Sequence, residues 1–383
     1  MESPAQQCGN NQQRPQKGTI YTIRLTGSDN MNNSWENGVR RVVPYVPGEQ
    51  PKNTNVIKLN TNENPYPPAP EVREILDNFD VSRMRLYPTP DAAVLTDAIA
   101  ERYGVDPAQV FVGVGSDDVI SMAFLTFFNS DKPILFPDIT YSFYPVWADV
   151  YRIPYVKKPL RPDFTIAPED YKCENGGIIF PNPNAPTGVY ESVEMIEDII
   201  RANPDSVVMI DEAYIDFGCE SCLPLTEKYD NLLVIQTFSK SRSMAGMRIG
   251  FAIGSKKLIQ YMNDVKFSIN SYTMNTVTQL CGAAAVRNEK YFRETVQKII
   301  DTREYSKTRL AELGFTFPDS KSNFIFASPK GKTAEYVFTE LKKRSIFVRW
   351  WDQPIIKDHL RISIGTREEM DALFSALEEI LNG

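Results

Sequence analysis

The residues of this 383-residue chain with the clearest chemical potential are Lys240 and the polar side chains around it. Ser239 and Lys240 follow an apolar run that begins at Leu232, and Arg248 precedes the next apolar run. A lysine at the mouth of a buried strand is partly desolvated, which favours the neutral amine that forms Schiff bases with aldehydes. Serine and arginine are suited to hold a phosphate. This combination predicts a site for pyridoxal phosphate, which carries both an aldehyde and a phosphate.

Polar clusters also follow other short apolar runs of the chain. These runs span residues 110–113, 133–138, 177–180 and 207–210. Helix-like stretches lie between several of them, for example at residues 117–128 and 191–201. Strands that alternate with helices indicate a parallel sheet covered on both faces, and ligands bind outside the carboxyl ends of such strands. We therefore expect an α/β fold in which the polar clusters converge on one crevice.

The pattern along the chain predicts a large domain with a three-layer, mostly parallel sheet and a smaller α+β domain. Residues 1–38 are expected to form a poorly ordered tail, in which Met31 is an alternative natural start. Residues 39–80 are assigned to an N-terminal arm and part of the smaller domain, residues 81–286 to the large cofactor-binding domain, and residues 287–383 to the rest of the smaller domain. Further helices are expected at 71–78, 92–103, 273–287, 289–313, 333–343 and 367–381, and further strands at 323–327, 346–349 and 360–364.

The composition narrows the possible classes of function. A net charge of −7 argues against a general nucleic-acid binder, and no apolar run approaches the roughly 20 residues that cross a bilayer. The single histidine, His359, excludes Ser-His-Asp and Cys-His catalysis unless it acts alone. Cys219 and Cys222 lack the second pair of ligands that a zinc site needs. We expect a cytoplasmic protein with no metal site and with neither nucleic-acid nor membrane partners.

Several motifs occur in an order that resembles the fold-type I pyridoxal-phosphate aminotransferases, and most of all the histidinol-phosphate aminotransferase family. The similarity runs from about Tyr45 to the C-terminus. The motifs are Leu-Asn-Thr-Asn-Glu-Asn-Pro (59–65), Asn-Pro-Asn-Ala-Pro-Thr-Gly (182–188), Asp-Glu-Ala-Tyr (211–214), Phe-Ser-Lys (238–240), Gly-Met-Arg-Ile-Gly-Phe (246–251) and Leu-Arg-Ile-Ser-Ile-Gly-Thr-Arg-Glu-Glu (360–369). The resemblance implies a homodimeric enzyme that exchanges an amino group between histidinol phosphate and 2-oxoglutarate.

The resemblance also implies roles for the residues that would act on the pyridoxal-phosphate ring. Lys240 would form the Schiff base with the cofactor and then move a proton at the substrate Cα. Asp211 would keep the pyridine nitrogen protonated, so that the ring draws electrons. Tyr214 would hydrogen-bond the phenolic oxygen of the ring, and Tyr141 would stack on the ring face.

The cofactor phosphate would be held at the start of a helix. Backbone N–H groups of Ser116 and Asp117 would point at the anion, and Ser239 and Arg248 would complete its site. Tyr87 is similar to a residue that reaches the cofactor phosphate of the neighbouring subunit, which implies a dimer with shared sites.

One departure from the family pattern concerns the ring oxygen. Family members often carry Asn immediately before Pro-Thr-Gly, whereas this chain has Ala185. Asn184 is expected to supply the contact, with Asn182 as the alternative.

Three residues resemble substrate ligands of the family. Arg361 matches the arginine that binds the substrate carboxylate, Arg349 is placed like the arginine that receives the substrate phosphate, and Tyr45 resembles a tyrosine that closes over the substrate. An aromatic amino-acid aminotransferase or a threonine-phosphate decarboxylase of the same subgroup is compatible with this set. The sequence therefore leaves the amino donor open.

Overall fold

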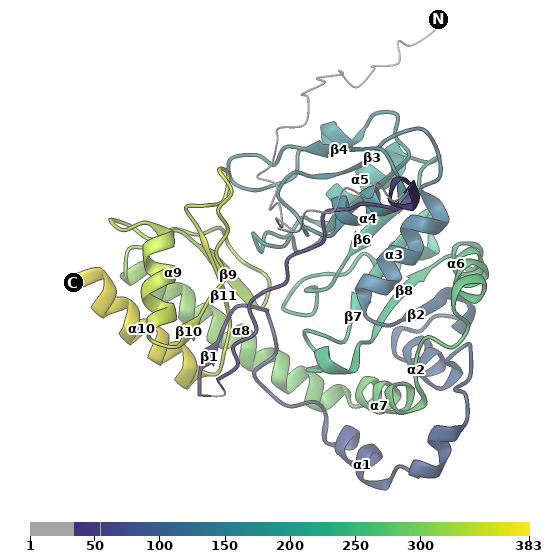
Figure 1. The fold of residues 1–383 in the computed structure, drawn as a ribbon, viewed down its shortest axis with the longest axis horizontal. Coiled ribbons are helices and arrows are strands. Elements are labelled where there is room, and N and C mark those ends of the chain that lie inside the picture. The colour runs from purple at the N-terminus through teal and green to yellow at the C-terminus, as the bar shows by residue number, and fades with distance from the viewer. Residues whose placement is uncertain (1–33, 54) are drawn as a thin grey trace, which may run out of the picture.

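The computed structural model describes residues 34–53 and 55–383 (Figure 1). Most of the predicted N-terminal tail, including Met31, lies outside the described residues. The last part of that segment forms a short 3₁₀ helix, η1 (Ser34–Gly38). No helix in the described part of the chain is long and apolar enough to cross a membrane.

A seven-stranded sheet forms the centre of the molecule, with strand order β2-β8-β7-β6-β5-β3-β4. β8 runs antiparallel to β2 and β7, and the other neighbouring pairs are parallel. The strands are β2 (Val110–Gly113), β3 (Ile134–Pro137), β4 (Tyr155–Lys158), β5 (Gly177–Pro181), β6 (Val208–Asp211), β7 (Leu232–Thr237) and β8 (Gly250–Gly254). Every residue of β5, β6 and β7 is buried, as expected for strands covered on both faces. The predicted mostly parallel sheet is confirmed.

Helices cover both faces of this sheet (Figure 1). One face packs against α3 (Ser116–Phe127), α4 (Tyr144–Tyr151) and α6 (Lys256–Ile269). The opposite face packs against α2 (Ala93–Tyr103), α5 (Val193–Ala202) and α7 (Thr276–Arg287), and α1 (Pro70–Asn78) packs on α7. Alternate residues serve the two faces, since Phe111 joins the first cluster and Val110 and Val112 join the second. The result is the three-layer α/β fold that the sequence predicts.

The C-terminal part forms a separate layer beside the sheet (Figure 1). β9 (Phe324–Ala327) pairs antiparallel with β11 (Leu360–Ser363), while β1 (Ile57–Lys58) pairs parallel with β10 (Ile346–Phe347). α8 (Glu289–Glu312), α9 (Ala334–Lys343) and α10 (Arg367–Asn382) pack on these strands around one apolar cluster. α10 begins with a capping box, in which Thr366 and Glu369 each accept the other's backbone N–H. The predicted domain boundaries stay a prediction. Within residues 39–80, β1 joins this cluster, whereas α1 packs on α7.

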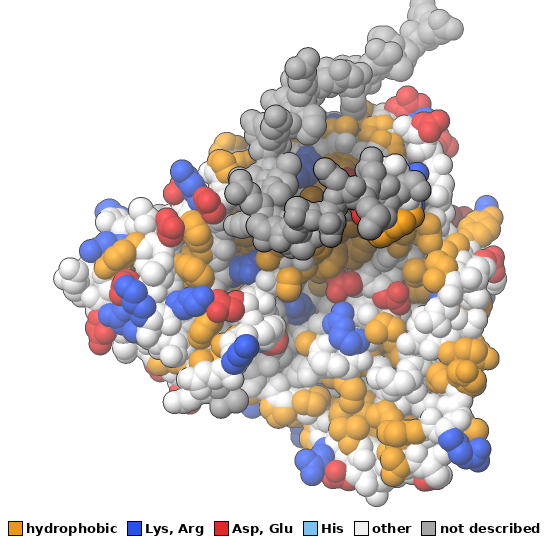
Figure 2. All heavy atoms as spheres, viewed as in Figure 1, with side chains coloured by type: hydrophobic (Ala, Val, Ile, Leu, Met, Phe, Trp, Pro, Cys, Tyr) orange, Lys and Arg blue, Asp and Glu red, His pale blue; other side chains and the backbone are white. Residues whose placement is uncertain are grey.

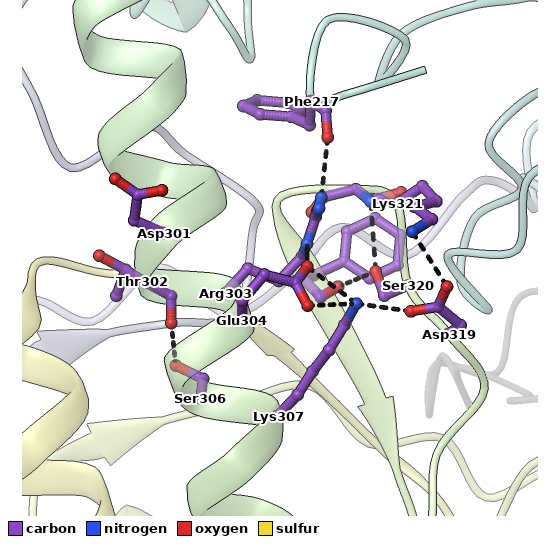
Figure 3. A network of polar contacts seen from close by, with 12 residues as sticks. Phe217, Asp301, Thr302, Arg303, Glu304, Ser306, Lys307, Asp319, Ser320 and Lys321 are labelled. Atoms are coloured by element: carbon purple, nitrogen blue, oxygen red, sulfur yellow. Dashed lines mark hydrogen bonds and ion pairs between the residues drawn. The ribbon is translucent and has the colours of Figure 1, made fainter. Parts of the chain in front are cut away.

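A buried arginine of α8 links the two parts of the molecule (Figure 3). Arg303 is 3% exposed and donates to the carbonyl oxygens of Phe217 at 2.9 Å and Ser322 at 3.1 Å. Its Nε also lies 2.9 Å from a carboxylate oxygen of Glu304. Because Phe217 follows β6 and Ser322 precedes β9, this one side chain fixes the segment after β6 against the C-terminal layer.

Candidate active site

A cavity of about 170 Å³ lies at the carboxyl ends of β5, β6 and β7. Pro181, Asp211 and Thr237, the last residues of these strands, line it. Parallel strands present their carboxyl ends at one edge, which is why segments distant in the sequence meet here. Of the predicted site residues, the cavity brings together Ser116, Asp117, Tyr141, Asp211, Tyr214, Ser239, Lys240 and Arg248.

A second cavity of about 230 Å³ adjoins the first. Both are lined by Thr61, Tyr141, Ala185, Tyr214 and Lys240. The second is also lined by the predicted substrate ligands Tyr45, Arg349 and Arg361. Most of the predicted cofactor residues and all three predicted substrate ligands therefore line two adjoining cavities that share Lys240.

Lys240 lies in the segment just beyond β7 and faces both cavities. Its Nζ donates to the carbonyl oxygen of Thr61 at 3.3 Å and lies 5.8 Å from the ring centre of Tyr214. Asn64 holds the backbone of the same segment, because its Nδ2 donates to the carbonyl oxygens of Lys240 and Ser241. The amine is thus placed between the two spaces by contacts from the N-terminal segment.

Asp211 is a buried carboxylate at the end of β6, 4% exposed. It accepts hydrogen bonds from the hydroxyl of Tyr144 at 3.0 Å and from the backbone N–H of Ala213 at 3.1 Å. Burial raises the pKa of Asp211 to about 6, although these two hydrogen bonds oppose that change. A cationic N–H in the cavity would stabilise the charged form, and a protonated pyridine nitrogen is such a group.

The start of α3 is shaped to receive an anion. Gly115 precedes the helix with a φ of 86°, and no side chain caps the helix at this residue. A Cβ at Gly115 would lie 2.3 Å from Nη2 of Arg248, and one at Gly250 would lie 2.2 Å from the backbone nitrogen of Ser116. The two glycines therefore let the guanidinium and the helix start lie close together. Such a group of donors suits a phosphate.

Asp117 and Tyr141 complete the wall next to this anion site. Asp117 lies 3.2 Å from Nη2 of Arg248 and accepts the hydroxyl proton of Tyr141 at 2.8 Å. Burial raises the pKa of Tyr141 well above its usual value, so the hydroxyl stays protonated and keeps donating to Asp117. The Tyr141 ring is thereby held in the wall of both cavities, where it can cover the face of a bound ring.

Arg349 and Arg361 lie opposite each other across an antiparallel bridge. Arg361 Nη2 donates to the carbonyl oxygen of Asn60 at 2.9 Å, and its buried Nε has no hydrogen-bond partner. Arg349 donates to backbone carbonyl oxygens of the segment that carries Tyr45. Neither arginine forms an ion pair with a carboxylate in the described part of the chain. Burial lowers the pKa of Arg361, so an anionic ligand would relieve an unfavourable charge.

Trp351 and Tyr45 shape the wall around these two arginines. The Trp351 ring centre lies 5.2 Å from the guanidinium carbon of Arg349 and 5.3 Å from that of Arg361. Tyr45 stacks on Phe143, with ring centres 4.2 Å apart, and burial raises its pKa. One indole thus contacts both cations, and a tyrosine of the N-terminal segment closes the space.

Three residues predicted to contact the cofactor line neither cavity, namely Asn182, Asn184 and Tyr87. Asn184 donates its amide to the carbonyl oxygen of Ile139 and to Thr187, and Asn182 exchanges hydrogen bonds with the backbone of Glu191. Neither asparagine lines either of these two cavities, and the Nδ2 groups of both bond atoms of the surrounding loops. Tyr87 is 82% exposed and lines a separate cavity of about 400 Å³.

The geometry adds residues that the sequence patterns did not single out. Tyr144, Trp351 and Asn62 contact predicted site residues or line a cavity. A signal existed for Asn62, since it belongs to the motif at residues 59–65. Tyr144 and Asp211 are far apart in the sequence, so no local pattern joins them.

Comparisons with known proteins agree with this arrangement. The model of the family described as aminotransferase class I and II matches residues 54–377. A histidinol-phosphate aminotransferase of Lactococcus lactis subsp. cremoris is 51% identical over 348 residues, which are 91% of this chain and 98% of that protein. A histidinol-phosphate aminotransferase of Clostridium botulinum is 48% identical over 352 residues, covering 92% of this chain and 99% of that protein.

A solved structure shows the same fold. The histidinol-phosphate aminotransferase of Sinorhizobium meliloti, in complex with pyridoxal-5'-phosphate, has a TM-score of 0.78 and 23% identity. The match covers 85% of this chain and 91% of that chain.

Proposed function

Because this chain belongs to the class I and II aminotransferases, we propose that it transfers an amino group between L-histidinol phosphate and 2-oxoglutarate. Relatives about half identical over nearly their whole length carry the name of this activity. The structural observation that carries the proposal is the pair of adjoining cavities that share Lys240. One has an anion site and a buried carboxylate, and the other has two arginines without carboxylate partners.

The residues of the first cavity fit pyridoxal phosphate. The uncompensated carboxylate of Asp211 matches a protonated pyridine nitrogen, and the donors at the start of α3 match the phosphate together with Ser239 and Arg248. When bound, this cofactor supplies an electron sink that makes the substrate Cα proton acidic. Lys240 would attach the cofactor and move the proton at Cα, and Tyr214 would hydrogen-bond the ring oxygen.

The second cavity fits substrates with two anionic or polar ends. Arg349 would bind the phosphate of histidinol phosphate, and Arg361 would bind a carboxylate of 2-oxoglutarate. Both guanidinium groups keep unused donors, because their hydrogen bonds go to backbone carbonyls. Tyr45 would close over either substrate from the N-terminal segment, which also excludes water.

We also propose that the active unit is a homodimer. Tyr87 stacks on Tyr272 and lines a cavity with Met84 and Leu86, and Figure 2 shows hydrophobic side chains gathered over the region of α1 and α7. The exposed large apolar side chains among residues 70–87 and at position 272 are Leu76, Val81, Met84, Leu86, Tyr87 and Tyr272. A second copy of the chain would cover this surface and place Tyr87 at the neighbouring cofactor phosphate. A cytoplasmic location, and the absence of nucleic-acid and membrane partners, stay predictions.

Steady-state kinetics with three amino donors test the function. Histidinol phosphate, phenylalanine and threonine phosphate are each supplied with 2-oxoglutarate, and glutamate formation is followed. We expect the largest kcat/KM for histidinol phosphate. A larger kcat/KM for phenylalanine would indicate an aromatic aminotransferase instead, and release of carbon dioxide from threonine phosphate would indicate a decarboxylase.

A further inference from the structure

Asn62 lines the second cavity in an unusual backbone conformation. Its φ is 55°, in the left-handed region, and it is 1% exposed. Its backbone N–H donates to Ser363 Oγ at 2.9 Å, and its carbonyl oxygen accepts from Asn323 Nδ2 at 3.0 Å. Asparagine adopts the left-handed region more readily than most non-glycine residues, and here backbone contacts on both sides hold it there. Non-glycine residues in this region cluster at functional sites. The contacts therefore point to a task for the Asn62 side chain.

The side chain of Asn62 connects Ser363 with Tyr214. Ser363 Oγ donates to Asn62 Oδ1 at 3.0 Å, and Asn62 Nδ2 donates to the hydroxyl oxygen of Tyr214 at 2.9 Å. A serine hydroxyl has one proton, and here Oδ1 accepts it, so the amide presents its N–H to Tyr214. The Tyr214 oxygen is then an acceptor toward Asn62, and its own proton is free to point elsewhere.

We infer that Asn62 is a positioning residue, locked by Ser363, that directs the hydroxyl proton of Tyr214 onto the ring oxygen of bound pyridoxal phosphate. The inference rests on the proposed function. Tyr214 lines both cavities, as does Ala185, which offers no donor. Asn184 Nδ2 already donates to the carbonyl oxygen of Ile139 and to Thr187 Oγ1. We therefore assign the hydrogen bond to the ring oxygen to Tyr214, which lines both cavities.

The consequence is measurable in the spectrum of the bound cofactor. A proton donated to the ring oxygen stabilises negative charge there and lowers the pH midpoint of the visible absorption band. A hydrogen bond accepted by the Tyr214 oxygen makes its proton a stronger donor. Other charged and titratable groups around Tyr214 contribute to the same midpoint and are unchanged in the test variants. These groups are Lys240, Arg361, Tyr45, Tyr141 and Tyr144, together with Glu63, Asp117 and Asp211 on the wall of the first cavity.

The test is a pH titration of the absorption band in the holoenzyme and in Asn62→Gly. Glycine keeps the left-handed backbone and removes only the amide. We expect the midpoint to rise by about 0.5 to 1 pH unit, the equivalent of one hydrogen bond. Asn60→Ala is the matched control, since Asn60 is also buried and lines the same cavity but donates to Glu49. Its midpoint should equal that of the wild type.

A double variant separates action through Tyr214 from a general structural effect. In a Tyr214→Phe background, Asn62→Gly should cause no further rise in the midpoint. An unchanged midpoint in Asn62→Gly, or an additive rise in the double variant, would overturn the inference. If Asn62→Gly does not bind the cofactor, Ser363→Ala is titrated instead, because it removes the hydrogen bond that orients the Asn62 amide. A rise in the midpoint smaller than about 0.5 to 1 pH unit, the equivalent of one hydrogen bond, supports the inference, and no rise refutes it. Failure of the proposed function gives a different result, namely a wild-type protein without a Lys240-dependent band.

Discussion

Asp211 gives the account its most quantitative prediction, because burial sets the cost of its charge. Burial raises the pKa of this carboxyl from 3.8 to about 6. A raised pKa in an acid destabilises the folded protein as pH rises from about 4 to 6, and the full cost persists above pH 6. At about 1.4 kcal/mol per pKa unit, the ionised group costs the cofactor-free protein about 3 kcal/mol at pH 7.5 and about 1 kcal/mol at pH 4.5.

Asp211→Asn removes this charge and keeps the shape of the side chain. Tyr144 and Ala213 bond different oxygens of Asp211, and asparagine has only one oxygen, so one hydrogen bond is lost at a cost of about 1 kcal/mol at either pH. We therefore expect the cofactor-free variant to be about 2 kcal/mol more stable than wild type at pH 7.5, and about equally stable at pH 4.5. With cofactor, the order reverses at pH 7.5, because the variant lacks the partner of the pyridine nitrogen. Its affinity for pyridoxal phosphate should fall about 100-fold.

Urea unfolding of both cofactor-free proteins at the two pH values, at one protein concentration, measures the difference. Cofactor affinity comes from titration of the absorption band. A stability difference that does not change with pH would refute the reasoning. So would a variant that binds pyridoxal phosphate as tightly as wild type.

Three further predictions concern the substrate cavity and the subunit contact. Arg349→Ala should lower kcat/KM for histidinol phosphate at least about 100-fold while changing that for phenylalanine less than about 10-fold, and equal losses would contradict its phosphate role. Trp351→Ala should raise KM for histidinol phosphate about 10-fold, because both arginines lose the ring that holds them. Trp350→Ala is the control and should leave KM unchanged, since the Trp350 Nε1 bonds the Lys357 carbonyl oxygen. Similar KM values in the two variants would contradict this role of Trp351. Inactive Tyr87→Ala and Lys240→Ala chains, when refolded together, should regain part of the activity through a mixed dimer with one intact site, and no recovery would count against shared sites.

The large sheet could be predicted closely because its central strands are buried on both faces. Such strands are short, continuous apolar runs, and β2, β5 and β6 lie within a residue of the predicted ranges. β4 did not stand out, because it is an edge strand whose residues are partly exposed and mostly polar or mixed. α4 and α6 were not predicted either. α4 has no side-chain cap at its start, whereas the N-cap Ser255 of α6 is a start signal that the prediction missed.

The candidate site could be predicted as far as each residue follows directly from a strand end or a motif. Lys240, Asp211 and Arg248 are such residues, and the cavity brings them together. Asn184 shows the limit, because neighbouring positions of one loop point in different directions, and only tertiary contacts decide which faces the cavity. Asn62 shows the same limit, since its partner Tyr214 lies far along the chain.

The central claim is that the side chain of Lys240 bonds covalently to the aldehyde of pyridoxal phosphate. Borohydride reduction of the protein with its cofactor, followed by protease digestion and peptide mass mapping, tests this claim directly. The account predicts a stable pyridoxyl label on Lys240 and none in Lys240→Ala. A label on another lysine, or an unlabelled Lys240 in protein that holds the cofactor, would contradict it.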